Sequence, residues 1–266
     1  MVTAVFEHLL DKYPGRISIE TLTPVESVTE VPTDAFPYKI QTNRGTIEAK
    51  HVVYCTNAHT GSLLPSLRSK IFPLRGHMTV QIPGDKFAHV GAERSWSITY
   101  GGHGIDYITQ NPKTDEIYIG GGFTRGRDDG IFDVGNTDDS SSDRLTRAHL
   151  HGILPVAFGS ENWGKDSSLG PRVKAEWTGI MGFTADGLPL VGNLPKFTTG
   201  RDGNGEWIAA GFNGYGMVNC WLSGKAVAHQ ILGKNVDWFP EQFGVSSERL
   251  LAMKDEDVVR GFLGSL

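Results

Sequence analysis

The stretch WIAAGFNGYGMVNCWLSGKAVAHQILG, residues 207–233, decides the fold. Its first four residues are apolar and predict a buried strand. A glycine-rich turn, Gly211–Gly216, follows, and the apolar residues after the turn recur at helical spacing. A glycine turn between a strand and a helix presents backbone N–H groups and the positive end of the helix dipole to an anionic ligand. The stretch therefore predicts a strand-turn-helix unit with an anion-binding turn.

The composition excludes several classes of protein. The 266 residues carry a formal net charge of −5, which argues against a general nucleic-acid binder. No apolar run is long enough to span a bilayer, so we expect no membrane association. Cys55 and Cys220 lie in apolar runs, and we expect two buried free thiols in a cytoplasmic, reducing compartment. No residue spacing is typical of a metal site, and His149 and His151, two apart on an expected helix, do not share a face.

The first seventy residues alternate between helix and strand patterns. Helical spacing over 1–13 ends at Pro14-Gly15. Short strands are expected at 17–20, 25–28, 38–41 and 46–49, with a hairpin turn at Asn43-Arg44-Gly45. Residues 51–58 are nearly continuously apolar, which is typical of a parallel strand buried on both faces.

Residues 73–170 have a different character. Segments 78–82, 96–100, 105–110 and 116–120 alternate like antiparallel strands, with a hairpin loop at 111–115. The polar loop 135–143 is expected to cap a helix over 145–154, and a strand returns at 173–177. We predict a mixed α/β fold: a sheet-and-helix nucleotide domain (1–72 and 171–235), an inserted antiparallel substrate domain (73–170) and a C-terminal tail (236–266).

Three groups of residues lie at the ends of these elements: Thr56-Asn57-Ala58, Asp186-Gly187 and Gly211–Met217. The surrounding sequences are HVVYCTNAHTGSLLP, then PLRGHM, then GFTADGLPLVGNLP, then AAGFNGYGM at the start of the last helix. In order and spacing they resemble the D-amino-acid-oxidase-like family of FAD-dependent oxidoreductases, which includes sarcosine and glycine oxidases. This resemblance implies an FAD-binding Rossmann-like domain with an inserted antiparallel sheet.

The resemblance also implies the cofactor contacts. Val25 matches the strand that borders the adenine, Thr56, Asn57 and Ala58 match a turn close to the cofactor, and Asp186 and Gly187 lie beside the flavin. The backbone of the glycine turn would face the flavin ring (Gly211, Phe212, Asn213, Gly214, Tyr215, Gly216 and Met217). Gly179 stands where some relatives carry a flavin-linked Cys, so the FAD is expected to be non-covalent. Val218 replaces a carboxylate-binding Lys, which disfavours a sarcosine-like substrate.

Substrate contacts are expected at Tyr107, Gln110, Tyr215, His77 and Arg75. Four candidates have a structural alternative. Tyr107 could be packed core, Arg75 a pin for the domain crossover, His77 a satisfied strand residue and Asp186 a turn former.

The implied chemistry is oxidation of a C–N bond in a small amine or amino acid by hydride transfer to flavin N5. The family's Gly-x-Gly-x-x-Gly unit is missing before Thr56, so the FAD domain is expected to be incomplete. Two alternatives stay open: a truncated, non-catalytic chain that binds no FAD, and one half of a split flavoenzyme. Either predicts an exposed hydrophobic sheet surface that a partner could cover.

Overall fold

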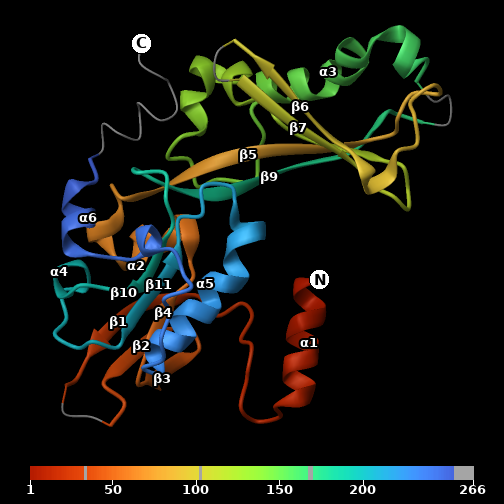
Figure 1. Ribbon diagram of the computed structural model, residues 1–266. Helices are drawn as coiled ribbons and strands as arrows, with labels where there is room; N and C mark the ends of the chain where they lie inside the picture. Colours follow the sequence, from red (N-terminus) through yellow and green to blue (C-terminus); the bar gives the residue numbers. More distant parts are fainter. Residues whose placement is uncertain (33–34, 102–103, 167–169, 255–266) are drawn as a thin grey trace. The chain divides into compact units, whose positions relative to one another are not determined.

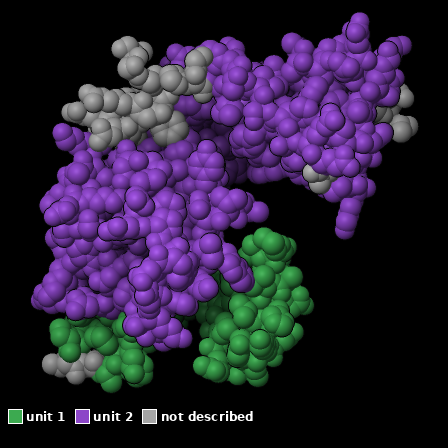
Figure 2. All heavy atoms as spheres, viewed as in Figure 1, with its two compact units in different colours: residues 1–52 green, residues 53–266 purple. Residues whose placement is uncertain are grey.

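The computed structural model describes residues 1–32, 35–101, 104–166 and 170–254. The chain divides into two compact units, Met1–Val52 and Val53–Leu266 (Figure 2). The mixed α/β class predicted from the sequence is confirmed, and the predicted division into domains stays a proposal. Residues 255–266, the end of the expected tail, lie outside the described part.

Unit 1 holds one helix and one three-stranded antiparallel sheet. Helix α1 spans Val2–Lys12, and the sheet has the order β1-β2-β3, from Val25–Glu30, Tyr38–Thr42 and Gly45–Ala49. The expected hairpin is present: Thr42 pairs with Gly45, and the Thr42 hydroxyl accepts from Arg44 N at 3.1 Å. Residues 17–20 form no strand, because only one of them is even partly buried and none pairs with the sheet.

The larger sheet of unit 2 is antiparallel throughout and has the order β6-β7-β8-β5-β9. The strands are β5 (Ile71–Gln81), β6 (Ser95–Tyr100), β7 (Gly104–Gln110), β8 (Ile117–Gly121) and β9 (Val173–Thr184). β9 pairs with β5 along its whole length, so residues 173–184 extend the antiparallel sheet beyond the boundary expected at residue 170. The hairpin at 111–115 is confirmed, since Asn111 N donates to Glu116 O at 2.8 Å.

Burial alternates along β7 and gives the large sheet two different faces. Asp106, Ile108 and Gln110 are buried, whereas Ile105 and Tyr107 are 47% and 44% exposed. Helix α3, Arg144–Trp163, lies along the buried face (Figure 1), where Leu150 and Leu154 share a hydrophobic core with the strands. The opposite face of the sheet, which carries Ile105 and Tyr107, is therefore the more exposed one.

Helix α3 begins at the predicted cap and runs further than predicted. Asp143, 2% exposed, accepts from Leu145 N at 3.0 Å and from Thr146 N at 3.1 Å. The prediction ended the helix near Leu154, before Pro155, yet helical structure continues to Trp163, with non-helical backbone at Gly159. Packing of Trp163 on Phe87, with ring centroids 5.6 Å apart, stabilises this extension although Pro155 and Gly159 disfavour helix locally.

The cap makes stability depend on pH. Burial alone would raise the pKa of the Asp143 carboxyl, but hydrogen bonds from Thr146 N, Arg127 and Leu145 N hold that pKa below its usual value. Because the pKa is lower in the folded state, the charged carboxylate stabilises the fold at pH values above the unfolded pKa of about 4. This stabilisation is lost as the pH falls through the folded-state pKa.

We expect Asp143→Ala to lower the free energy of unfolding by about 1 kcal/mol at neutral pH. Asp143→Asn should keep the hydrogen bonds of the cap and lose the pH-dependent part of the free energy of unfolding. Urea unfolding at neutral and acid pH checks both; equal acid sensitivity of Asp143→Asn and wild type would contradict the prediction.

The smaller sheet of unit 2 carries the decisive stretch. Its order is β10-β11-β4, from Leu190–Asn193, Glu206–Ala210 and Val52–Tyr54, and helix α5, Gly216–Ile231, packs on it through Ala226 and Val227. Unit 2 also contains the short helices α2 (Thr60–Leu63), α4 (Lys196–Thr199) and α6 (Ser247–Ala252).

Part of this smaller sheet and its helix is uncovered. Val53 is 41% exposed, so β4 is not buried on both faces as predicted. Both cysteines are exposed as well, and the expectation of buried thiols is wrong. On α5 the apolar residues Val218 and Trp221 are 75% and 74% exposed, because the core contacts come from the other side of the helix.

Candidate functional site

A cavity of about 950 Å³ lies in unit 2 between the open face of the large sheet and the β11–α5 loop. Strands β5, β7 and β9, the turn at 185–187 and the loop at 213–215 supply its walls. The walls are largely apolar, with Phe72, Met181, Phe183 and Phe123 among them. Most of the side chains predicted from the sequence to contact the substrate line this cavity.

The glycine loop is held in a left-handed backbone conformation. Gly211, Asn213 and Gly214 have φ of 74°, 53° and 81°. Gly211 N donates to Asn57 Oδ1 at 2.9 Å, and Asn213 N donates to the Gly182 carbonyl at 2.9 Å. The Asn213 side chain also accepts from Thr184 N at 2.9 Å. Strand β9 and the turn at Asn57 thus fix the loop before any ligand binds.

The start of α5 is open to a ligand. No side chain of the described residues caps this helix. At Gly214, which lines the cavity, an added Cβ would meet no atom nearer than Phe183 Cζ at 4.0 Å. An uncapped helix start beside empty space is suited to a planar or anionic group.

The turn at Thr56–Ala58 supports this loop from behind. Thr56 Oγ1 lies 2.9 Å from Thr60 Oγ1, Asn57 has φ of 46° and Ala58 is buried. A Cβ at Gly182 would lie 2.5 Å from Asn57 Oδ1, so glycine is needed for β9 to approach the turn. These residues do not line the cavity; they position the loop that does.

Asp186 and Gly187 line the cavity, but the Asp186 carboxylate already has a partner. Arg249 of α6 donates from Nε to Asp186 Oδ2 at 2.7 Å and from the terminal guanidinium to Oδ1 at 3.1 Å. The same guanidinium binds the Pro189 carbonyl at 3.0 Å. The C-terminal tail therefore neutralises this carboxylate and fixes the turn.

Arg75 and His77 meet on Asp133, and all three are buried. Arg75 Nε and a terminal nitrogen lie 2.8 and 2.7 Å from Asp133 Oδ1, and His77 Nε2 lies 3.1 Å from Oδ2. The rest of the Arg75 guanidinium donates to the carbonyls of Asp138 and Ser141. Arg75 thus pins the loop after β8, whereas Nδ1 of His77 has no hydrogen-bond partner among the described residues.

The three remaining candidates differ in position. Tyr107 lines the cavity, and its ring packs closely on Gly120, where an added Cβ would lie 2.5 Å from the ring. Burial, with the nearby charge of Asp106, raises the pKa of the Tyr107 phenol, which therefore stays a hydrogen-bond donor. Tyr215 lines the mouth and is 69% exposed. Gln110 is buried outside the cavity walls, where its carbonyl accepts from Val90 N at 2.9 Å.

The remaining residues predicted to contact the cofactor lie outside the cavity walls. Phe212 is buried in the core under α5, Gly216 begins that helix and Met217 is 85% exposed. Val25 begins β1 in unit 1, whereas the cavity is formed by residues of unit 2.

Sequence reasoning missed Asp133, Arg249 and the aromatic wall at Phe72 and Phe183. Asp133 follows Asp128-Asp129 in a segment that looks like a solvated loop, and no local pattern marks its burial. Arg249 lies 63 residues from Asp186 in sequence. For Phe72, the alternation of Phe72 and Leu74 along β5 was a signal in the sequence.

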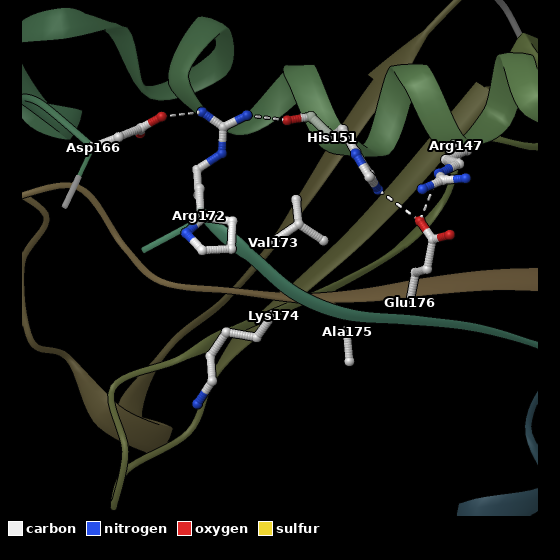
Figure 3. A pocket seen from close by; sticks show the side chains of 9 residues that line it. Arg147, His151, Asp166, Arg172, Val173, Lys174, Ala175 and Glu176 are labelled. Carbon is white, nitrogen blue, oxygen red and sulfur yellow. Dashed lines mark hydrogen bonds and ion pairs between the residues drawn. The ribbon is translucent and has the colours of Figure 1, made fainter. Parts of the chain in front are cut away.

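A second cavity, of about 490 Å³, lies between α3 and β9 (Figure 3). Most of its charges are paired with one another: Arg147 and His151 each contact Glu176 Oε2 at 2.8 Å, and Arg172 contacts Asp166 at 2.8 Å. The two contacts to Glu176 tie helix α3 to the edge strand β9.

His149 turns to a different partner from His151, with Nε2 2.7 Å from Asp106 Oδ2. In the described part of the chain, no group of three or more His, Cys, Asp or Glu side chains could hold a metal ion. Likewise, no described helix has the length and apolar character needed to cross a membrane.

A family model described as FAD dependent oxidoreductase matches residues 16–230. The chain belongs to this DAO family of FAD-dependent oxidoreductases, which confirms the resemblance predicted from the sequence and FAD as the family's cofactor. A search of the curated proteins finds no match.

Solved structures show the same fold at low sequence identity. Glycine oxidase from Geobacillus kaustophilus is 20% identical, with a TM-score of 0.55 over 85% of this chain and 52% of that structure. L-proline dehydrogenase from P. horikoshii is 18% identical, with a TM-score of 0.60 over 98% and 59%. L-amino acid deaminase from Proteus vulgaris is 15% identical, with a TM-score of 0.61 over 92% and 54%. The chain spans about half the length of each of these structures.

Proposed function

We propose that this chain supplies the flavin-ring and substrate side of a non-covalent FAD enzyme that oxidises a C–N bond. The observation that carries the proposal is the β11–α5 loop, whose fixed, uncapped helix start borders a largely apolar cavity. The named activities of the structural neighbours, which include oxidation of glycine and dehydrogenation of L-proline, support an amine or amino-acid substrate.

The residues at the cavity fit a flavin ring. The turn Asn213-Gly214-Tyr215 and the first turn of α5 would face the part of the ring that gains negative charge, where oriented N–H groups and a helix start are stabilising. Phe183 would pack on the ring system, and Asp186-Gly187 would lie at its edge. When bound, the flavin supplies a hydride acceptor for the carbon that carries the amine.

The protein side chains would then position the substrate and exclude water. Tyr107, as a neutral phenol, donates a hydrogen bond from the open sheet face, and His77 offers a ring nitrogen from β5. Phe72, Met181 and Phe123 keep the reacting carbon in an apolar environment. An amine bound in its neutral form needs no strong general base for this step.

We further propose that a dinucleotide-binding unit with the Gly-x-Gly-x-x-Gly turn covers the exposed surface of β4 and α5, as the split-enzyme hypothesis expects. Val53, Met217, Val218 and Trp221, between 41% and 85% exposed, support this partner, because exposed apolar side chains at helical spacing are typical of an interaction surface. A cytoplasmic location is part of the proposal and rests on two free cysteines, which stay reduced there.

The first test is the visible absorption spectrum of the purified chain with and without added FAD. Bound flavin should shift and sharpen the visible bands, and Gly214→Leu should abolish that change by filling cavity space. Gly214→Ala is the matched control, since it carries the same cost of positive φ with far less volume. A colourless wild type that leaves added FAD free would exclude flavin binding by this chain alone. FAD would then bind only together with the proposed dinucleotide-binding unit, or the chain would be non-catalytic.

A further inference from the structure

The cavity wall contains a buried hydrogen-bond acceptor with no partner. His77 is 4% exposed and lines the cavity, and its Nδ1 atom is unpaired among the described residues. Leaving a buried polar atom unpaired costs free energy, so such an atom in a ligand cavity indicates a ligand contact.

The neighbours of His77 decide which ring nitrogen is the acceptor. A carboxylate only accepts hydrogen bonds, so Nε2, 3.1 Å from Asp133 Oδ2, carries the proton. Arg75 already balances the charge of Asp133 through two contacts to Oδ1, and no second buried cation is needed. With the proton on Nε2, Nδ1 is the ring nitrogen left to accept from an N–H or O–H group of a ligand.

Among the residues that the structure describes, this cavity offers no free cation for a carboxylate. Among its described lining residues the only arginine is Arg75, and its nitrogens are occupied by Asp133 and by loop carbonyls. Arg249, which contacts the lining residue Asp186, is likewise occupied by that carboxylate. A buried carboxylate without a partner is strongly disfavoured.

From these observations we infer the substrate class of the proposed function: an apolar amine without a carboxylate, whose N–H donates to Nδ1 of His77. Asp133 is a positioning residue that fixes the tautomer and the orientation of the ring. The apolar walls at Phe72, Met181 and Phe183 would receive the carbon substituent. The inference rests on the proposed function only where it takes an amine as the group that reacts.

The test uses the chain without flavin, so its result can be read even if FAD does not bind. Benzylamine and phenylalanine are the probes, which share an aromatic ring and an amine and differ by a carboxylate. Titration of each into ¹⁵N-histidine-labelled protein should move the Nδ1 resonance of His77 with benzylamine. Phenylalanine should bind at least about tenfold more weakly.

Variants separate a ligand contact from a structural role. His77→Gln keeps a donor toward Asp133 and replaces the Nδ1 acceptor by an amide oxygen in a different position, so benzylamine binding should weaken about tenfold. His149→Gln alters a similar His–Asp contact outside the cavity, at 2.7 Å, and should leave binding unchanged. Absence of benzylamine binding, equal or tighter binding of phenylalanine, or a histidine signal that does not move would overturn the inference. The wild-type comparison of the two probes decides the matter if His77→Gln fails to fold.

Discussion

Replacing Asp133 with alanine should lower the free energy of unfolding of unit 2 by about 3–5 kcal/mol. The Arg75 and Asp133 side chains are 2% and 1% exposed, and alanine would leave the guanidinium buried without its counter-ion. The change also removes the acceptor for His77 Nε2, at 3.1 Å. Urea unfolding followed by circular dichroism measures the loss.

A double-mutant cycle shows whether the loss comes from the uncompensated charge. Arg75→Met with Asp133→Ala removes both charges, so the double variant should be clearly more stable than the sum of the two single losses predicts. Asp202→Ala, which removes an exposed ion pair to Lys196 at 3.4 Å, should cost less than about 1 kcal/mol. Additive losses at Arg75 and Asp133 would show that the pair is not coupled.

Local patterns predicted the parts of the fold in which the core face repeats regularly. The alternation at 105–110 predicted β7, and the turn at 43–45 predicted the β2–β3 hairpin. The glycine loop could also be predicted, because positive φ at Gly211 and Gly214 requires a residue type that is visible in the sequence. The Asp143 cap belongs to the same group, since the carboxylate binds N–H groups only two and three residues away.

The remaining features depend on contacts between distant segments. Asp133 reaches residues 56 and 58 positions away, and Arg249 reaches across 63 positions to Asp186. Gln110 has the alternation of a buried strand residue, and only the structure places it against Val90 N and away from the cavity. The two exposed cysteines show the opposite effect, since an apolar run predicts burial only where some element covers it.

Gly211→Ala should destabilise unit 2 by about 2–5 kcal/mol and abolish any flavin binding. A residue with a Cβ at φ of 74° costs about 1–2 kcal/mol, and the new methyl would lie 2.3 Å from Thr184 Cγ2, which adds about 1–3 kcal/mol of overpacking. Thr184 cannot move freely, because its backbone N–H donates to Asn213 Oδ1 at 2.9 Å. Movement of either residue displaces the loop that borders the cavity. Denaturant unfolding and FAD titration measure the two effects.

Gly214→Ala separates backbone strain from the steric contact within the same loop. Its φ is 81°, so the backbone cost is similar, but the nearest atom to the added Cβ is Phe183 Cζ at 4.0 Å. We therefore expect Gly214→Ala to lose only about 1–2 kcal/mol and to keep the loop in place. The difference between the two variants measures what close packing of Gly211 on Thr184 contributes. If both variants lose the same stability, the loop is held by its hydrogen bonds to Asn57 and Gly182, and the packing under Gly211 is not decisive.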